Sequence, residues 1–167
     1  MAEHLLRLRA KEFGWTDLEV VSAGTWATDG SPVTEEARQV LAAAGIAGGG
    51  TKHASRTLTP DMVEAADVVI AMTSVHLREI ESVAPGSRRK VFLLKEIAEL
   101  APGDGGIDGM LAARRPDWRR ALDLDDPLGF GRSTYERCFA DIQRGIDGLV
   151  RRLGPPREPP AGHRSTA

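Results

Sequence analysis

The chain has 167 residues, 41% of them hydrophobic, which is enough for one compact domain with an apolar core. Its formal net charge of −2, without a basic block interleaved with aromatic residues, argues against a nucleic-acid partner. No apolar run reaches the roughly 18 residues that cross a bilayer, so no membrane partner is expected. One cysteine and four scattered histidines predict a cytoplasmic chain without a disulfide, a metal site or a cofactor.

Helical and strand patterns alternate along the first part of the chain. Residues 1–14 place apolar side chains near one helical face and end at a glycine. The apolar run LEVVSAG, residues 18–24, predicts a buried strand. Residues 31–45 carry a helical stripe that stops at a glycine, and residues 59–66 open with a threonine cap followed by proline. A helix is therefore expected in each of these last two segments.

The alternation continues through the middle of the chain. The run DVVIAMT, residues 67–73, predicts a second buried strand, and residues 74–83 return to the helical period. Residues 90–100 open as a strand and turn helical after Leu94. Residues 101–125 are rich in glycine and charge, which predicts an irregular loop with one helical turn. This loop serves either as a lid or as a passive connection.

Strand–helix alternation predicts an α/β fold, a single domain whose parallel sheet is flanked by helices, over residues 1–153. Ligands of such sheets bind beyond the carboxyl ends of the strands, where this chain has polar turns. Residues 154–167 contain four prolines and no apolar periodicity, which predicts a disordered tail.

The stretch TYERCFADIQRG, residues 134–145, contains the spacing C-x-x-x-x-x-R by which cysteine-dependent phosphatases bind phosphate. A phosphate loop needs converging backbone N–H groups, usually from glycines, and it follows a strand. The residues between Cys138 and Arg144 include no glycine, and the apolar side chains from Tyr135 to Leu153 follow the helical period. The segment therefore predicts one long helix with Cys138 as a buried core thiol, about 120° round the helix from Arg144.

Four motifs occur in an order that resembles the low-molecular-weight protein tyrosine phosphatases. They are VVSAGT at residues 20–25, HASRTLT at 53–59, ADVVIAMT at 66–73 and DDPLG at 125–129. Each motif is weak by itself, but the four together are specific, and the resemblance covers residues 1–153. It implies the fold of that family, which is phosphotyrosine protein phosphatase I-like.

One part of the family pattern is missing from these residues. The family's phosphate loop reads C-x-x-x-x-x-R-[ST]-P-x-A-E, and MAEHLLR at residues 1–7 is similar to the helix that follows it. The nucleophilic cysteine, the loop arginine and the first strand of the sheet would precede Met1. We therefore expect an N-terminally truncated domain, inactive as written, with a true start upstream of Met1.

The resemblance implies hydrolysis of a phosphate monoester through a cysteinyl-phosphate intermediate. The family's general acid is the aspartate before the proline of its D-P motif, which here is Asp126, with Asp125 as the neighbouring candidate. An Asp-Pro pair also starts ordinary turns, which is the simpler explanation of the DDPLG motif. The substrate is either a phosphotyrosine protein or a small phosphate ester.

Four further positions match the family's site. Ser22 and His53 match positions that brace the phosphate loop from behind, although a strand-end serine and a surface histidine need no such role. Trp26 lies where the family shapes its substrate cleft, and its ring can stack on a phenyl group. Phe130, near the D-P motif, is the candidate for the other wall. Packing against neighbours is the alternative for both aromatic side chains.

Two other functions compete with the phosphatase. A non-catalytic pseudophosphatase, which binds a partner or a phosphoprotein, is consistent with the missing nucleophile. An arsenate reductase of the same fold needs further cysteines for an internal relay, and this chain has one. Retention of the DPLG motif favours the phosphatase, since a binding module has no need of a general acid.

Overall fold

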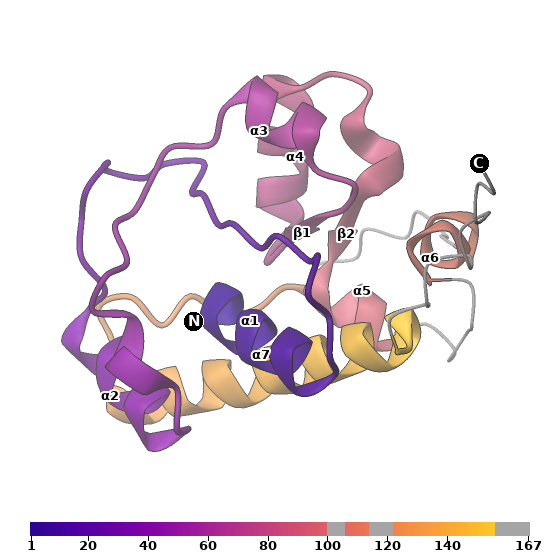
Figure 1. The fold of residues 1–167 in the computed structure, drawn as a ribbon. Helices are drawn as coiled ribbons and strands as arrows, with labels where there is room; N and C mark the ends of the chain where they lie inside the picture. Colours follow the sequence, from indigo (N-terminus) through magenta and orange to yellow (C-terminus); the bar gives the residue numbers. More distant parts are fainter. Residues whose placement is uncertain (100–105, 114–121, 156–167) are drawn as a thin grey trace, which may run out of the picture.

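The computed structural model describes residues 1–99, 106–113 and 122–155. Within them, α-helices surround a small parallel sheet (Figure 1). The α-helices are α1 (Ala2–Glu12), α2 (Glu35–Ala43), α3 (Pro60–Ala65), α4 (Ser74–Val83), α5 (Leu94–Glu99), α6 (Gly106–Ala113) and α7 (Arg132–Leu153). Two short 3-10 helices are η1 (Ala47–Gly50) and η2 (Ser87–Lys90).

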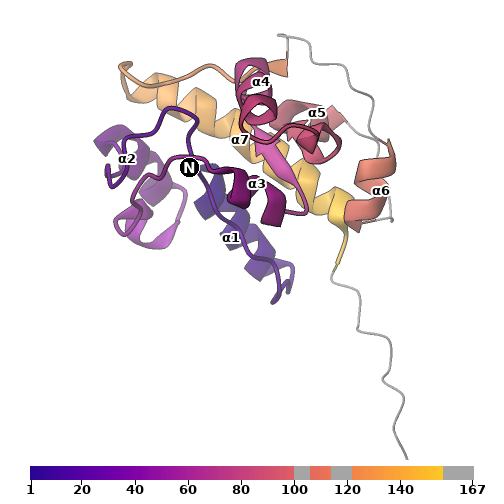
Figure 2. The same ribbon diagram turned by 90° about the horizontal axis from the view of Figure 1, so that it is seen from above.

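The sheet pairs β1 (Val69–Ala71) in parallel with β2 (Val91–Leu93), with Ile70 opposite Phe92. Both strands lie in the apolar runs that predicted them, and every residue of β2 is buried. Helix α4 packs against both strands, and α5 follows directly from β2. Figure 1 shows α3 and α4 on one side of the sheet and α1 and α7 on the other, and in Figure 2, seen from above, a strand crosses over α7. The predicted α/β fold, a single domain with a parallel sheet flanked by helices, is confirmed.

Helix α7 forms the base of the molecule, and α1, α2 and α5 pack along it (Figure 1). Two glycines allow α5 to approach closely. A Cβ atom at Gly145 would lie 2.4 Å from Leu94 Cγ, and one at Gly148 would lie 3.0 Å from Ala98 Cα. A side chain at either position would therefore push the two helices apart.

Three threonines begin helices, as expected for caps. The side-chain oxygens of Thr34, Thr59 and Thr73 each accept a hydrogen bond from the backbone N–H three residues further on. These bonds satisfy donors that the first turn of a helix leaves without an intrahelical partner. At the other end of the chain, Gly154 takes φ 70° where α7 stops.

Two expectations were wrong. Residues 18–24, predicted as a strand, form no ladder with any described strand, and the segment's one bridge joins Gly24 to Thr57. Val21 is accordingly 47% exposed. A strand requires a neighbour that supplies N–H and C=O groups in register, and no described strand lies beside this segment. The loop expected over 101–125 contains the eight-residue helix α6 rather than a single turn.

The long C-terminal helix is confirmed. Cys138 and Arg144 both belong to α7, so the C-x-x-x-x-x-R spacing lies within a helix and not in a phosphate loop. Cys138 is buried, with 8% of its surface exposed. From residue 156 onward the predicted tail lies outside the described residues. Among the described helices, none is both long and apolar enough to cross a membrane.

Candidate active site

The segment before the D-P motif is fixed at the carboxyl end of β1. The backbone N–H of Leu124 donates to the Met72 carbonyl at 2.9 Å, directly after the strand. The carboxylate of Asp123 accepts from the Ser74 N–H at 2.5 Å and from the Ser74 hydroxyl at 3.0 Å, at the start of α4. Lys95 Nζ donates to the Asp123 carbonyl at 2.8 Å. These contacts carry the chain to the edge of the sheet where ligands of α/β proteins bind.

Asp126 lies in the turn that follows, and its side chain is exposed. Its Oδ1 accepts the Leu128 N–H at 3.0 Å, and the Phe130 N–H donates to the Pro127 carbonyl at 3.0 Å. The turn leaves the side chains of Leu128 and Phe130 64% and 62% exposed. Two apolar groups thus accompany an accessible carboxylate. Sequence analysis did not single out Leu128. The signal for it was an apolar residue inside a D-P-x-G turn, next to the candidate acid.

Ser22 and His53, each matched to a position that braces the phosphate loop, meet at a buried carboxylate on α1. Glu3 is 8% exposed, and its Oε2 accepts the Ser22 hydroxyl. His53 Nδ1 lies 3.8 Å from the same oxygen, and Arg7 Nη1 lies 2.7 Å from Oε1. These partners compensate the burial of a charged group. Sequence analysis did not single out Glu3. This residue matches the glutamate that ends the family's R-[ST]-P-x-A-E pattern, and that match could have identified it.

A second histidine belongs to this cluster. The rings of His4 and His53 meet edge to face with their centroids 5.5 Å apart. Burial lowers the pKa of His4, which favours the neutral ring at physiological pH. A Cβ at Gly50 would lie 3.1 Å from His4 Nε2, so this glycine lets the backbone of η1 pass close to the ring.

The loop that carries Trp26 is held by the HASRTLT motif. Asp29 Oδ1 accepts the backbone N–H of Thr57 at 2.6 Å and its hydroxyl at 2.8 Å. The N–H of Gly30 donates to the Ser55 carbonyl at 2.8 Å. Trp26 itself is 87% exposed. The motif therefore acts as a frame for a loop whose tryptophan projects from the surface.

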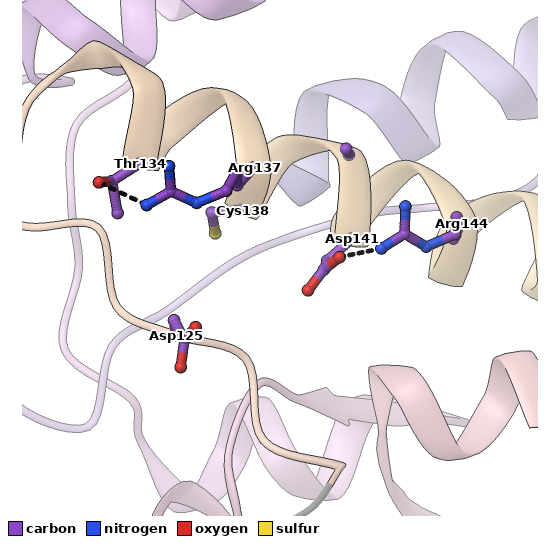
Figure 3. A pocket seen from close by; sticks show the side chains of 7 residues that line it. Asp125, Thr134, Arg137, Cys138, Asp141 and Arg144 are labelled. Carbon is purple, nitrogen blue, oxygen red and sulfur yellow. Dashed lines mark hydrogen bonds and ion pairs between the residues drawn. The ribbon is translucent and has the colours of Figure 1, made fainter.

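A pocket of about 290 Å³ lies between α7 and the D-P loop. In Figure 3 the Cys138 thiol points from α7 toward the segment with Asp125, which lines the same pocket. Burial raises the pKa of Cys138, and the nearby carboxylate of Asp141 adds to the effect. Arg144, the arginine of the chance motif, pairs with Asp141 on the surface of α7. The thiol therefore lacks the features that activate a cysteine nucleophile.

The structure gathers the predicted site residues into three groups. Ser22 and His53 meet at the carboxylate on α1, and Asp126 and Phe130 share the D-P loop. Trp26 stands on a third segment, tied to α4 through its indole N–H. Within the described ranges, no three His, Cys, Asp or Glu side chains are grouped so as to hold a metal ion. The described residues thus present an exposed carboxylate, exposed apolar side chains and a braced helix start.

Comparison with known proteins identifies the family. The model of the family described as low molecular weight phosphotyrosine protein phosphatase matches residues 1–108. A protein-arginine-phosphatase of Bacillus subtilis is 38% identical over 92% of this chain and 87% of its own length. A low molecular weight protein-tyrosine-phosphatase of Streptomyces coelicolor is 31% identical over 90% of this chain and 82% of its own length. The crystal structure of the low molecular weight protein tyrosine phosphatase from T. tengcongensis superimposes with a TM-score of 0.70, at 28% identity, over 89% of this chain and 86% of that one. The chain belongs to the low molecular weight phosphotyrosine protein phosphatase family.

Proposed function

We propose that this chain belongs to a phosphate-monoester hydrolase in which Asp126 serves first as general acid and then as general base. One observation carries the proposal. The D-P loop is anchored to β1, α4 and α5 by the residues before it, and it leaves the Asp126 carboxylate accessible. An acid that must reach a leaving group needs both a fixed position and access to the substrate.

In the proposed reaction a cysteine thiolate attacks phosphorus, and the bond from phosphorus to the leaving group breaks. Asp126 gives its proton to the departing atom, so the leaving group departs neutral. The ionised Asp126 then takes a proton from water, which attacks the phosphocysteine and releases phosphate and thiolate. Ser22 and His53 support this step indirectly, because through Glu3 they fix the first turn of α1.

The thiolate belongs in a loop that leads into α1, as the family pattern implies. The start of a helix presents N–H groups and the positive end of its dipole, which stabilise both a thiolate and a phosphate. Cys138, the single cysteine of the sequence, is buried on α7 with a raised pKa. We therefore propose that the 167 residues by themselves do not hydrolyse phosphate esters, and that residues encoded before Met1 supply the nucleophile.

The substrate is proposed to be a phosphorylated protein. The relatives named above comprise protein-tyrosine and protein-arginine phosphatases. Phosphotyrosine is a phosphate monoester and phosphoarginine a phosphoramidate, and both carry the phosphoryl group on a planar side chain. Trp26, Leu128 and Phe130 expose the apolar surface that such a group requires. The single cysteine agrees with the proposed location in the cytoplasm.

The decisive experiment is Asp126→Asn in the protein translated from the in-frame codons before Met1. The variant should lose roughly 10²–10⁴-fold in kcat with an aryl phosphate. The loss should shrink as the leaving phenol becomes more acidic, because such a group needs less protonation. Asp125→Asn is the matched control and should be nearly neutral. If instead Asp125→Asn abolishes activity and Asp126→Asn does not, the acid is the neighbouring residue.

The two alternative functions, pseudophosphatase and arsenate reductase, predict different sequences before Met1. An upstream frame without a cysteine loop would favour the non-catalytic pseudophosphatase. An upstream segment that adds several cysteines would favour the arsenate reductase, whose internal relay the present single cysteine does not provide.

A further inference from the structure

Trp26 is exposed, yet its indole is not free to turn. The side chain is 87% exposed, and its Nε1–H donates to Glu79 Oε1 at 2.5 Å. Glu79 lies on α4, which is 53 residues further along the chain and packs against both strands of the sheet. The hydrogen bond therefore joins a surface ring to a rigid element of the fold.

The backbone around Trp26 is fixed independently of this bond. Asp29 and Ser55 hold the loop through the contacts described above, and the N–H of Leu58 donates to the Gly24 carbonyl at 3.0 Å. With the backbone held, the remaining freedom of Trp26 is rotation about its two side-chain torsions. The bond to Glu79 opposes this rotation.

Glu79 is suited to hold the indole because it stays ionised. Hydrogen bonds from Thr25 and Trp26 lower the pKa of Glu79, and the charge of nearby Arg78 acts in the same direction. Its Oε2 is shielded from solvent, and this desolvation raises the pKa, but less than the two hydrogen bonds lower it. An indole N–H bonded to a carboxylate is a charge-assisted pair, stronger than a bond to a neutral acceptor.

We propose that Glu79 is a positioning residue that holds the Trp26 ring as a wall of the substrate site, and so sets the preference for phosphoryl groups carried on planar side chains. The inference rests on the proposed function, because it assigns the ring to that site. A ring held in one orientation stacks on a phenyl or guanidinium plane without the loss of torsional freedom that a mobile ring suffers on binding.

The first test needs no enzymatic activity and uses the 167-residue chain. The indole ¹H–¹⁵N resonance of Trp26 is assigned by its disappearance in Trp26→Phe. Glu79→Ala should speed solvent exchange of this proton by about three- to tenfold and shift the resonance upfield, as expected for loss of one exposed charge-assisted bond. Glu79→Gln, which keeps an acceptor oxygen, should give an intermediate result. The matched control is Glu81→Ala on the same helix, whose carboxylate accepts the Gly86 N–H and should leave the resonance unchanged.

The second test uses the protein translated from upstream of Met1. Glu79→Ala should raise KM about three- to tenfold for phosphotyrosine and phosphoarginine peptides, with kcat little changed. A phosphate ester without a planar group should be hydrolysed as before, and Glu79→Gln should recover part of the loss. A merely structural role would affect all substrates alike.

The outcomes of these two tests distinguish failure of the inference on Glu79 from failure of the proposed function. An unchanged Trp26 resonance in Glu79→Ala, or an equal effect on planar and non-planar substrates, would overturn the inference while leaving the proposed function intact. An upstream frame without a cysteine loop, or an extended protein that hydrolyses none of these substrates, would overturn the proposed function and the inference together.

Discussion

The contact between α5 and α7 predicts the effect of a single methyl group. An alanine Cβ at Gly145 would lie 2.4 Å from Leu94 Cγ and 2.7 Å from Leu94 Cδ1, and Leu94 is fully buried. Ordinary contact requires a displacement of about 1 Å, and overpacking of this kind costs about 1–3 kcal/mol. Replacing glycine within a helix contributes about 1 kcal/mol in the opposite direction. Gly145→Ala should therefore lower the free energy of unfolding by up to about 2 kcal/mol.

This change can be measured by urea unfolding of the 167-residue chain, followed by circular dichroism. The urea concentration at the midpoint should fall, and the dependence of the unfolding free energy on urea concentration should stay the same. Gly109→Ala in α6 is the control, because a Cβ there meets no atom within 4 Å. It should stabilise the protein by up to about 1 kcal/mol. Leu94→Ala should partly relieve the Gly145→Ala variant in a double-mutant cycle. A Gly145→Ala protein stabilised as much as the Gly109→Ala control would refute the close approach of the two helices.

Two further predictions concern a thiol and a histidine. Cys138→Ala should cost about 1 kcal/mol of stability, and the 167-residue chain should show no aryl phosphatase activity before or after the change. An activity that disappears in Cys138→Ser would contradict the assignment of Cys138 to the core. Because burial lowers the pKa of His4, the unfolded chain binds the proton more tightly than the folded one. Stability should therefore be greatest above the unfolded value of about 6.5 and fall as the pH drops below it. The urea midpoint measured between pH 8 and 5 should show this decline, and His4→Gln should flatten it; an equally steep decline in the variant would exclude His4 as its source.

Features that depend on nearby residues could be predicted from the sequence. The threonine cap at Thr59 was predicted from a local signal, because the cap and the N–H that it satisfies are three residues apart. The α7 helix was predictable for the same reason, since its apolar side chains repeat with the helical period over 22 residues. That period also identified Cys138 as a core residue in spite of its match to a phosphate-binding spacing.

Features that depend on distant partners could not be predicted in this way. LEVVSAG has the composition of a strand, but strand structure requires a neighbouring strand, which the composition of the segment does not reveal. The same holds for Glu3 and Glu79, which look like ordinary surface glutamates on amphipathic helices. Their roles come from Ser22 and Trp26, which lie 19 and 53 residues away in the chain. The sequence thus named Ser22, His53 and Trp26 as candidates, and it missed the two glutamates that these side chains contact.

The anchoring of the D-P loop separates two properties that evolution can alter: the stability of the core and the identity of the side chains in the loop. The loop is fixed before residue 125 by Asp123 and Leu124 and after residue 131 by α7. None of the residues from 125 to 131 is buried. Exchanges at such positions usually change stability by less than about 0.5 kcal/mol, except at Gly129, whose φ of 82° favours glycine. Under the proposed function, selection can therefore vary the side chains around Asp126, and with them the range of substrates, while the core that positions the loop stays constant.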